Sequence, residues 1–289
     1  MSISTELGEQ KEVRLPQGTI LYRERGTGEP LVFIHGALVN GDLWRKVVPH
    51  LSKDYRCITP DLPLGSHTIP MNADADLSPY GLAKLIDDFL GALGLQGVTL
   101  VGNDTGGGLC QIVVTRHPDR VGRLVLTPCD AYEHFPPTFF KWLLYPARWP
   151  LGSKVLLAPM RFKAMRNAPT GFGLLTKKGI DPEITAAWLE PARRDAGIRR
   201  DLAKLIRGLH PRYTLEAADR LGEFDRPVLL VWTREKDFFT WEHAEKLSKA
   251  FPDARLEEVE DSYTFVSEDQ PEQLAKLIAE FARPPVAAS

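Results

Sequence analysis

The sequence predicts an α/β protein built on a doubly wound, mostly parallel sheet, with a helical lid inserted between two strands. Two observations predict this class. Short apolar runs typical of buried strands alternate with segments whose apolar residues have helical spacing. This alternation stops between about residues 131 and 221, where no strand pattern occurs. Alternating strands and helices imply right-handed crossovers between parallel strands, so the interruption predicts a lid over their carboxyl ends.

The part of the chain before the lid supplies most of the expected sheet. Its strands are short apolar runs such as PLVFI and VTLVG. Its longest helix pattern is LSPYGLAKLIDDFLGALGL, in which Ser78 is a suitable N-cap before Pro79. We expect strands at 30–36, 55–63, 98–103 and 123–130, and helices at 42–54, 77–95 and 107–121.

The alternation resumes after the lid, with an expected strand at 226–233, helix at 241–251, strand at 254–260 and helix at 271–282. The sheet domain is therefore expected to comprise residues 1–130 and 222–289, and the lid residues 131–221. The lid is rich in proline and in aromatic residues, which either line an apolar pocket or form the lid's own small core: Phe135, Phe139, Phe140, Trp142, Tyr145 and Trp149.

Composition narrows the class of partner. The 289 residues carry a formal net charge of −2, which gives no reason to expect nucleic acid or an acidic membrane surface as a partner. The three cysteines are widely spaced, and the N-terminus has no apolar signal segment. No apolar run approaches the ~18 residues that span a bilayer. We therefore expect a cytoplasmic protein, monomeric or homodimeric, that takes a small-molecule substrate and uses no cofactor or metal.

The stretch LVGNDTGGGLCQ, residues 100–111, places one carboxylate between glycines. A strand pattern enters this stretch and a helix pattern leaves it, which is the context of a nucleophile elbow. Glycines allow a sharp turn and a close approach of helix and strand, and the residue at the tip projects into the cleft. Asp104 occupies this tip. The alternative is that Asp104 only caps the following helix, but a cap does not need glycine on both sides.

On these residues the chain resembles the α/β-hydrolase superfamily over nearly its whole length. His35-Gly36, after PLVFI, resembles the oxyanion loop of that family, residues 102–106 resemble its elbow, and DQPEQLAKLIAEF resembles its last helix. An aspartate at the elbow is typical of haloalkane dehalogenases and epoxide hydrolases. The resemblance implies that Asp104 attacks a saturated carbon and that a histidine-activated water hydrolyses the resulting ester. The backbone N–H groups of Ala37 and Thr105 would form the oxyanion hole.

The remaining catalytic positions match this family incompletely. Asp237, in TREKDFFT, lies where the family's acid usually follows a strand, and Asp130 is the alternative acid position. The histidine position falls on Thr264, in DSYTFVSEDQP, a segment without any histidine. A threonine cannot accept a proton near pH 7 as an imidazole does. An ester formed on Asp104 would therefore lack its usual route to hydrolysis.

Other histidines are candidates for the missing role. His67 lies in a loop just past the end of an expected strand, where a side chain can reach the cleft. His134 opens the lid and is a candidate for the pocket, and His243 lies in the first turn of a helix. His35 is expected to hold the oxyanion loop through side-chain hydrogen bonds.

The expected substrate-binding residues also differ from those of the families named above. Haloalkane dehalogenases place Trp directly after the nucleophile, where this chain has Thr105, and a second halide-holding residue after His-Gly, where it has Ala37. Fluoroacetate dehalogenases have Arg after the nucleophile. Epoxide hydrolases use lid tyrosines to protonate the opening epoxide, and Tyr145 and Tyr213 are the candidates here.

Three hypotheses follow. The first is a hydrolase of the dehalogenase or epoxide-hydrolase type acting on a small apolar molecule, with His67, or Asp237 acting on water, replacing the missing histidine. The second is a lyase, isomerase or cyclase of secondary metabolism in which Asp104 is a general acid or base, its pKa raised by an apolar pocket. The third is a ligand-binding module without turnover, as in hormone receptors that share the fold and lack the histidine.

Overall fold

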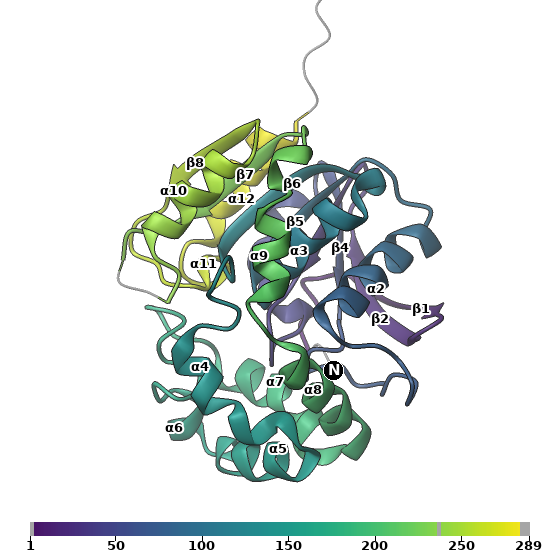
Figure 1. Ribbon diagram of the computed structural model, residues 1–289, viewed down its shortest axis with the longest axis vertical. Coiled ribbons are helices and arrows are strands. Elements are labelled where there is room, and N and C mark those ends of the chain that lie inside the picture. The colour runs from purple at the N-terminus through teal and green to yellow at the C-terminus, as the bar shows by residue number, and fades with distance from the viewer. Residues whose placement is uncertain (1–2, 236–237, 284–289) are drawn as a thin grey trace, which may run out of the picture.

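Eight strands form one sheet in the order β1-β2-β4-β3-β5-β6-β7-β8 in the computed structural model, which describes residues 3–235 and 238–283 (Figure 1). The antiparallel pairs are β1–β2 and β2–β4, and every other neighbouring pair is parallel. The expectation of a mostly parallel, doubly wound sheet is confirmed. The strands are β1 (Glu9–Leu15), β2 (Gly18–Arg25), β3 (Glu29–Ile34), β4 (Tyr55–Pro60), β5 (Val98–Asp104), β6 (Val121–Cys129), β7 (Val228–Trp232) and β8 (Ala254–Glu258).

The central strands are nearly continuous apolar runs because helices cover both of their faces. The two N-terminal strands are different, and their sequence did not predict them. In β2 only Ile20 and Tyr22 are buried, and charged residues occupy most other positions of β1 and β2. A half-exposed strand with so many charged residues has a weak apolar signal, so its pairing with β4 decides its structure.

Helices complete the two outer layers. α2, α3 and α9 pack against one another and lie in front of the sheet in Figure 1, whereas α1 packs against α12. The Ser78 hydroxyl accepts a hydrogen bond from the Gly81 N–H at 3.2 Å, which confirms the expected N-cap of α2. The helices outside the insertion are α1 (Val48–Leu51), α2 (Pro79–Ala92), α3 (Thr105–Arg116), α10 (Trp241–Ala250), α11 (Val266–Asp269) and α12 (Pro271–Ala282).

The single helix expected at 42–54 is wrong. The structure has a 3-10 turn at Gly41–Trp44 and then the short helix α1. Pro49 lacks an N–H and cannot continue a helix from the preceding turn, so it lies in the first turn of α1 instead.

The insertion between β6 and β7 is helical, apart from an isolated bridge between Ala131 and His134. We propose residues 131–221 as a cap and use that name below. Figure 1 shows α4 to α8 below the sheet, while α9 returns to pack on α3. No helix in the described part of the chain has the length and apolar character needed to cross a membrane. The cap helices are α4 (Thr138–Leu143), α5 (Pro150–Leu157), α6 (Lys163–Arg166), α7 (Pro182–Arg194), α8 (Ala196–Gly208) and α9 (Arg212–Ala218).

The first turn of α3 packs directly on the end of β3, and Gly106 makes this close approach possible. A Cβ atom at Gly106 would lie 2.6 Å from the Ile34 carbonyl oxygen and would also overlap the carbonyl of His35. Backbone atoms cannot move aside as the tip of a flexible side chain can. The packing of α3 on β3 therefore requires glycine at this position.

We expect Gly106→Ala to lower the free energy of unfolding by about 1–3 kcal/mol, because the added methyl group forces α3 away from β3. Urea denaturation followed by circular dichroism measures the effect. The matched control is Gly222→Ala, where the nearest atom to the new methyl group is the Ala250 carbonyl oxygen at 3.8 Å. Equal unfolding midpoints for the two variants would contradict this account of the elbow.

Candidate active site

An apolar cavity lies between the carboxyl ends of the central strands and the cap. Its empty volume is about 810 Å³, including the open mouth. Of the residues that line it, Asp104, Thr105, Asp130 and Thr170 are polar, and the others are apolar residues or glycine. They are Ala37, Leu38, Pro136, Pro137, Phe140, Leu143, Leu144, Leu156, Leu157, Met160, Gly171, Phe172, Leu175, Leu189 and Leu209. A cavity of this kind suits a largely hydrocarbon ligand with one reactive polar end.

Asp104 lies at the point where β5 ends and α3 begins. Its φ of +52° is in the left-handed region, which non-glycine residues rarely adopt. Its side chain makes no capping hydrogen bond to α3, so the alternative of a simple helix cap is not supported. A Cβ atom at Gly36 would overlap the Asp104 carboxylate, so the carboxylate lies directly against the loop that follows β3.

Asn103 fixes the elbow to two neighbouring segments. Its side-chain amide nitrogen donates to the Thr127 hydroxyl at 2.8 Å and lies 3.1 Å from the Pro128 carbonyl oxygen. The same nitrogen donates to the Thr264 carbonyl oxygen at 2.8 Å. Because Asn103 is buried, these bonds are shielded from water and hold the backbone of Asp104 in its unusual conformation.

His35 anchors the loop that contains Gly36 and Ala37. The Leu62 N–H donates to Nε2 of His35 at 2.9 Å, so Nδ1 carries the proton and donates to the Gly36 carbonyl at 2.8 Å. Burial lowers the pKa of His35 to about 4. The imidazole is therefore neutral at physiological pH and serves as a link between two loops, in agreement with the expected loop-holding role.

Asp130 is the second carboxyl group of the cavity. It follows β6, is fully buried, and neither of its carboxylate oxygens has a hydrogen bond of ordinary geometry among the described residues. Burial raises the pKa of Asp130 well above its usual range, the negative charge of Asp104 raises it further, and a contact with the Thr105 hydroxyl offsets this only in part. The pair therefore favours a state in which Asp130 holds a proton beside an ionised Asp104.

The segment that contains Thr264 packs against the elbow, through the hydrogen bond from Asn103. Thr264 is fully buried but is not among the residues that line the cavity. No histidine lines the cavity within the described part of the chain. The loop expected to supply a histidine is therefore next to Asp104, but it presents no imidazole there.

His67 lies outside the cavity lining. Its ring is buried, and Nε2 lies 3.2 Å from the Asp201 carboxylate of α8 in the cap. The same carboxylate accepts from the Met71 N–H at 2.8 Å. The partner of His67 is thus the Asp201 carboxylate, which links the sheet domain to the cap. The hypothesis that His67 activates water at Asp104 is not supported by this geometry.

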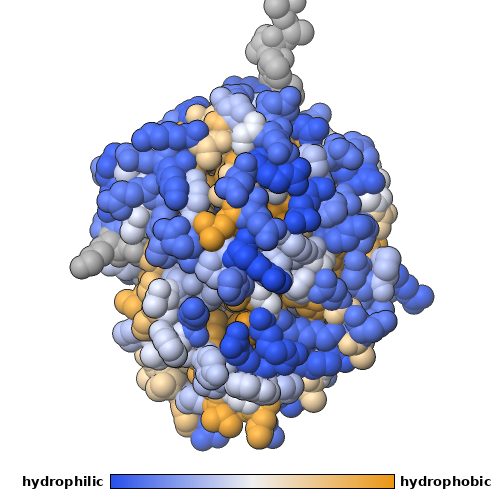
Figure 2. Space-filling model, in the orientation of Figure 1, coloured by the Kyte–Doolittle hydropathy of each residue, from blue (hydrophilic) through white to orange (hydrophobic). Residues whose placement is uncertain are grey.

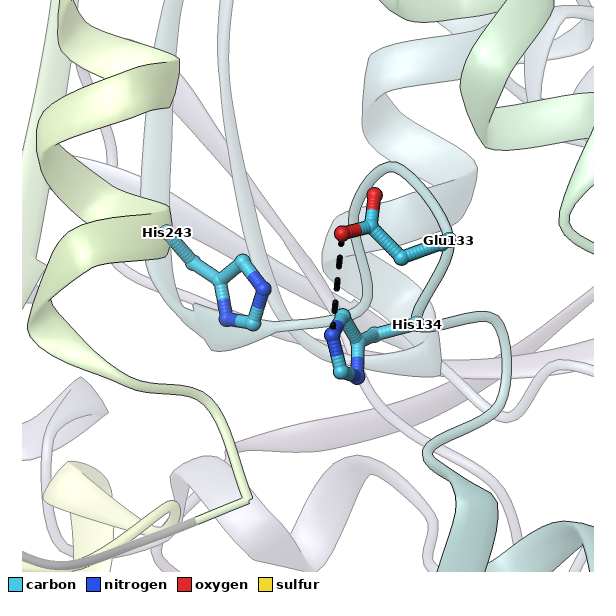
Figure 3. Close-up of side chains that lie close together, drawn as sticks. All are labelled: Glu133, His134 and His243. Carbon is cyan, nitrogen blue, oxygen red and sulfur yellow. Dashed lines mark ion pairs between the residues drawn. The ribbon is translucent and has the colours of Figure 1, made fainter.

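His134 also lies outside the cavity lining. Figure 3 shows it close to both Glu133 and His243, and its Nε2 is 3.9 Å from the Glu133 carboxylate. The potential ligand atoms of these three residues all lie within 4.8 Å of one another, and zinc accepts both imidazole and carboxylate ligands. This cluster is separate from the cavity, so the expectation that His134 binds substrate is not supported.

The cap aromatics divide in a way that neither sequence alternative anticipated. Phe140 lines the cavity and Phe135 is fully buried. Tyr145 is 48 % exposed, packs edge-on against Trp149, and is absent from the cavity lining, so the expectation that it contacts substrate is not supported by this geometry. Phe139, Trp142 and Trp149 are also exposed. Asp237, the other expected acid, lies outside the described residues.

Comparison with known proteins gives the family. A model of the alpha/beta hydrolase family matches residues 31–277. The chain belongs to that family. Haloalkane dehalogenase 2 of Mycobacterium tuberculosis is 26 % identical over 284 residues and the alignment covers 91 % of each chain. A hydrolase of 2-hydroxy-6-oxo-6-phenylhexa-2,4-dienoate from Comamonas testosteroni is 25 % identical over 276 residues, again with 91 % of each chain covered.

A third relative has a different kind of activity in its name. It is the cis-3-alkyl-4-alkyloxetan-2-one decarboxylase of Xanthomonas campestris, 28 % identical over 270 residues with 88 % of each chain covered. Among solved structures, haloalkane dehalogenase DatA from Agrobacterium tumefaciens has a TM-score of 0.77 at 22 % identity, covering 96 % of this chain and 98 % of that one. The structural likeness supports the fold, and the expectation of an α/β-hydrolase enzyme is confirmed at the level of the family.

From its sequence, Asp130 is predicted only as an alternative position for the acid that orients a histidine. The signal was present, since an aspartate follows the apolar strand RLVLTPC at the edge where ligands bind in parallel sheets. The sequence does not reveal the burial of Asp130 or its proximity to Asp104, which together raise its pKa.

The raised pKa of Asp130 predicts a pH-dependent loss of stability. Above the unfolded-state pKa of about 3.9 and below the raised folded-state pKa, the folded protein holds a proton that the unfolded chain has released. Stability from this group is therefore greatest at low pH and falls by about 1.4 kcal/mol per pH unit as pH rises through this window. Asp130→Asn removes this slope, so its stability relative to wild type should increase with pH.

Urea denaturation at several pH values between 4.5 and about 7.5, a range that extends upward from the usual carboxyl pKa, measures the difference. Asp219→Asn, at an exposed aspartate of the cap, is the control and should follow the wild-type profile. Parallel profiles for wild type and Asp130→Asn would show that Asp130 is not the proton-holding group.

Proposed function

We propose that this protein is a hydrolytic enzyme that opens a small, largely apolar substrate by attack of the Asp104 carboxylate on a saturated carbon, with epoxides as the favoured class. The observation that carries the proposal is the pairing of Asp104 with the buried carboxyl group of Asp130 in one apolar cavity. Such a pair supplies a nucleophile and an acid without a histidine.

The first step uses both groups. The Asp104 carboxylate attacks one ring carbon of the epoxide, and the bond between that carbon and the ring oxygen breaks. An alkoxide is a poor leaving group, so the ring oxygen takes the proton of Asp130 as the bond breaks. The products of this step are an ester on Asp104 and an ionised Asp130. A halide needs no such proton, and the Trp residue that helps to hold a halide in dehalogenases is Thr105 here.

The second step reverses the role of Asp130. Burial and the charge of Asp104 both raise the pKa of Asp130, and esterification removes the second of these causes, so an ionised Asp130 becomes less unfavourable. Asp130 then takes a proton from a water molecule, and the hydroxide attacks the ester carbonyl of Asp104. The N–H groups of Ala37 and Thr105 are the proposed donors to the developing oxyanion. The tetrahedral intermediate then collapses, and the bond between the Asp104 carbonyl carbon and the substrate oxygen breaks. The departing oxygen takes the proton that Asp130 gained, which releases the diol, and the proton left on the Asp104 carboxylic acid passes to Asp130.

This cycle explains how position 264 can be threonine. In the related enzymes a histidine activates the water, whereas here the proton received by Asp130 in the second step is the one it returns to the product. One water is added to the epoxide, and both carboxyl groups regain their starting states. The proposal needs no role for His67, and an orienting role for Asp237 stays a prediction.

We expect Asp104→Asn to reduce kcat/KM for an epoxide substrate by at least about 10⁴-fold, because it removes the nucleophile. Asp130→Asn should cost about 10²–10⁴-fold, because it removes the proton donor. A panel of aliphatic and aryl epoxides, with diol formation measured by mass spectrometry, identifies the substrate for these assays. Asp219→Asn serves as the control, and unchanged turnover in Asp104→Ala would overturn the proposal.

The ester on Asp104 should be visible directly. With an alkyl bromide or iodide, which needs no acid for its departure, Asp130→Asn should accumulate a covalent adduct on Asp104, detected by intact mass and peptide mapping. In wild type, a single turnover in H₂¹⁸O should place the isotope in the Asp104 carboxyl group. An absence of label in Asp104 during diol formation would show that water attacks the substrate directly.

A second candidate is a non-hydrolytic lyase or isomerase in which the carboxyl pair moves protons and no ester forms. Two observations favour it: no histidine lines the cavity in the described part of the chain, and one full-length relative is named a decarboxylase. It predicts turnover without isotope incorporation from H₂¹⁸O into Asp104. A ligand-binding role without catalysis predicts saturable binding with no product in either assay.

A further inference from the structure

The outer surface of the cap differs in composition from the rest of the molecule. Nine of the eleven large apolar side chains exposed in the described part of the chain lie between residues 139 and 174, and the other two are Ile3 and Leu215. Trp142 and Leu151 are each 72 % exposed. Figure 2 shows apolar side chains gathered over the lower end of the molecule, where Figure 1 places α5. The nine are Phe139, Trp142, Tyr145, Trp149, Leu151, Val155, Phe162, Met165 and Leu174.

The same segment has an unusual charge. Between Glu133 and Asp181 the sequence contains no aspartate or glutamate and eight lysine or arginine residues. Five of the eight alternate with the exposed apolar residues and have no ion pair with a carboxylate in the described part of the chain: Lys141, Arg148, Lys154, Arg161 and Lys163. The formal net charge of −2 for the whole chain conceals this segregation. We call these five residues and the nine apolar ones the outer cap face.

Helix α5 shows how the outer cap face exposes apolar side chains. Ser153 and Leu157 are buried inside the cap, and Leu156 and Leu157 line the cavity. The opposite side of the helix exposes Leu151, Val155 and, between them, Lys154. A surface helix that is apolar on both sides is characteristic of one that contacts a second apolar environment.

We propose that the outer cap face docks the protein on the surface of an anionic lipid bilayer. Exposed Trp, Leu and Phe side chains interleaved with Lys and Arg are the composition that enters the interface of such a membrane, with the apolar groups in the acyl boundary and the cations among the headgroups. This proposal differs from the expectation of no membrane partner, which followed from the net charge of the whole chain. It concerns peripheral binding and does not depend on the proposed reaction.

The charge pattern favours a bilayer over a second copy of the chain. A symmetric dimer through this face would bring the same five cations against one another, whereas an anionic surface neutralises all of them. The exposed tryptophans and leucines distinguish the outer cap face from a purely electrostatic site for a nucleic acid, whose backbone offers no hydrocarbon.

The cap residues that line the cavity lie on the inner side of this face. Docking by the outer cap face would therefore place the cavity next to the lipid phase, into which an apolar ligand partitions.

Vesicle flotation with the full chain tests the proposal. The protein should float with vesicles of phosphatidylcholine and phosphatidylglycerol at low salt, should dissociate as salt rises, and should float weakly with phosphatidylcholine alone. The double variant Trp142→Ser/Leu151→Ser should lower the bound fraction by about tenfold or more, because it removes two apolar anchors. Lys154→Glu/Lys163→Glu should abolish the preference for the anionic lipid.

Matched controls lie outside the face. Leu215→Ser changes an exposed leucine of α9, and Lys249→Glu changes an exposed lysine of α10, and both should float like wild type. Circular dichroism confirms that each variant is folded. The proposal is wrong if wild type does not float, if the face and control variants float equally, or if it binds RNA but not vesicles. A dimer in sedimentation equilibrium that Trp142→Ser/Leu151→Ser dissociates would assign the face to self-association instead.

Discussion

Two carboxyl groups enclosed in one apolar cavity cannot both be ionised without a large free-energy cost, because burial destabilises each charge and the two charges repel each other. In this protein the elbow presents Asp104, and burial together with that charge keeps the proton on Asp130. The proposed reaction depends on this difference in protonation between Asp104 and Asp130. When Asp104 loses its charge, Asp130 can release its proton, and when the charge returns the proton is retained.

The surrounding structure maintains the geometry of this pair. The left-handed backbone of Asp104 is unfavourable by itself and persists because its neighbours leave no alternative. Asn103 ties the elbow to β6 and to the loop containing Thr264, and neutral His35 holds the loop against which the Asp104 carboxylate lies. These supports are present although no histidine lines the cavity among the described residues.

The cap has two apolar faces with different roles. Its inner face contributes most of the cavity lining, and its outer face combines exposed aromatic and aliphatic side chains with lysine and arginine. A small domain normally hides such apolar residues in its own core. The proposed contact with a bilayer gives the outer face an environment that suits both its apolar and its charged side chains.

The sequence by itself determined the sheet class and the strand–turn–helix around Asp104, because these depend on local apolar patterns and glycine spacing. It also shows a threonine, Thr264, where the family resemblance predicts a histidine. The N-terminal strands escaped prediction, since β1 and β2 are defined by pairing rather than by their own composition. Only the tertiary structure decided that His67, His134 and Tyr145 lie outside the cavity lining and that Asp130 lies beside Asp104. Burial, pKa and the direction of a side chain arise from contacts between segments far apart in the chain, which no local pattern records.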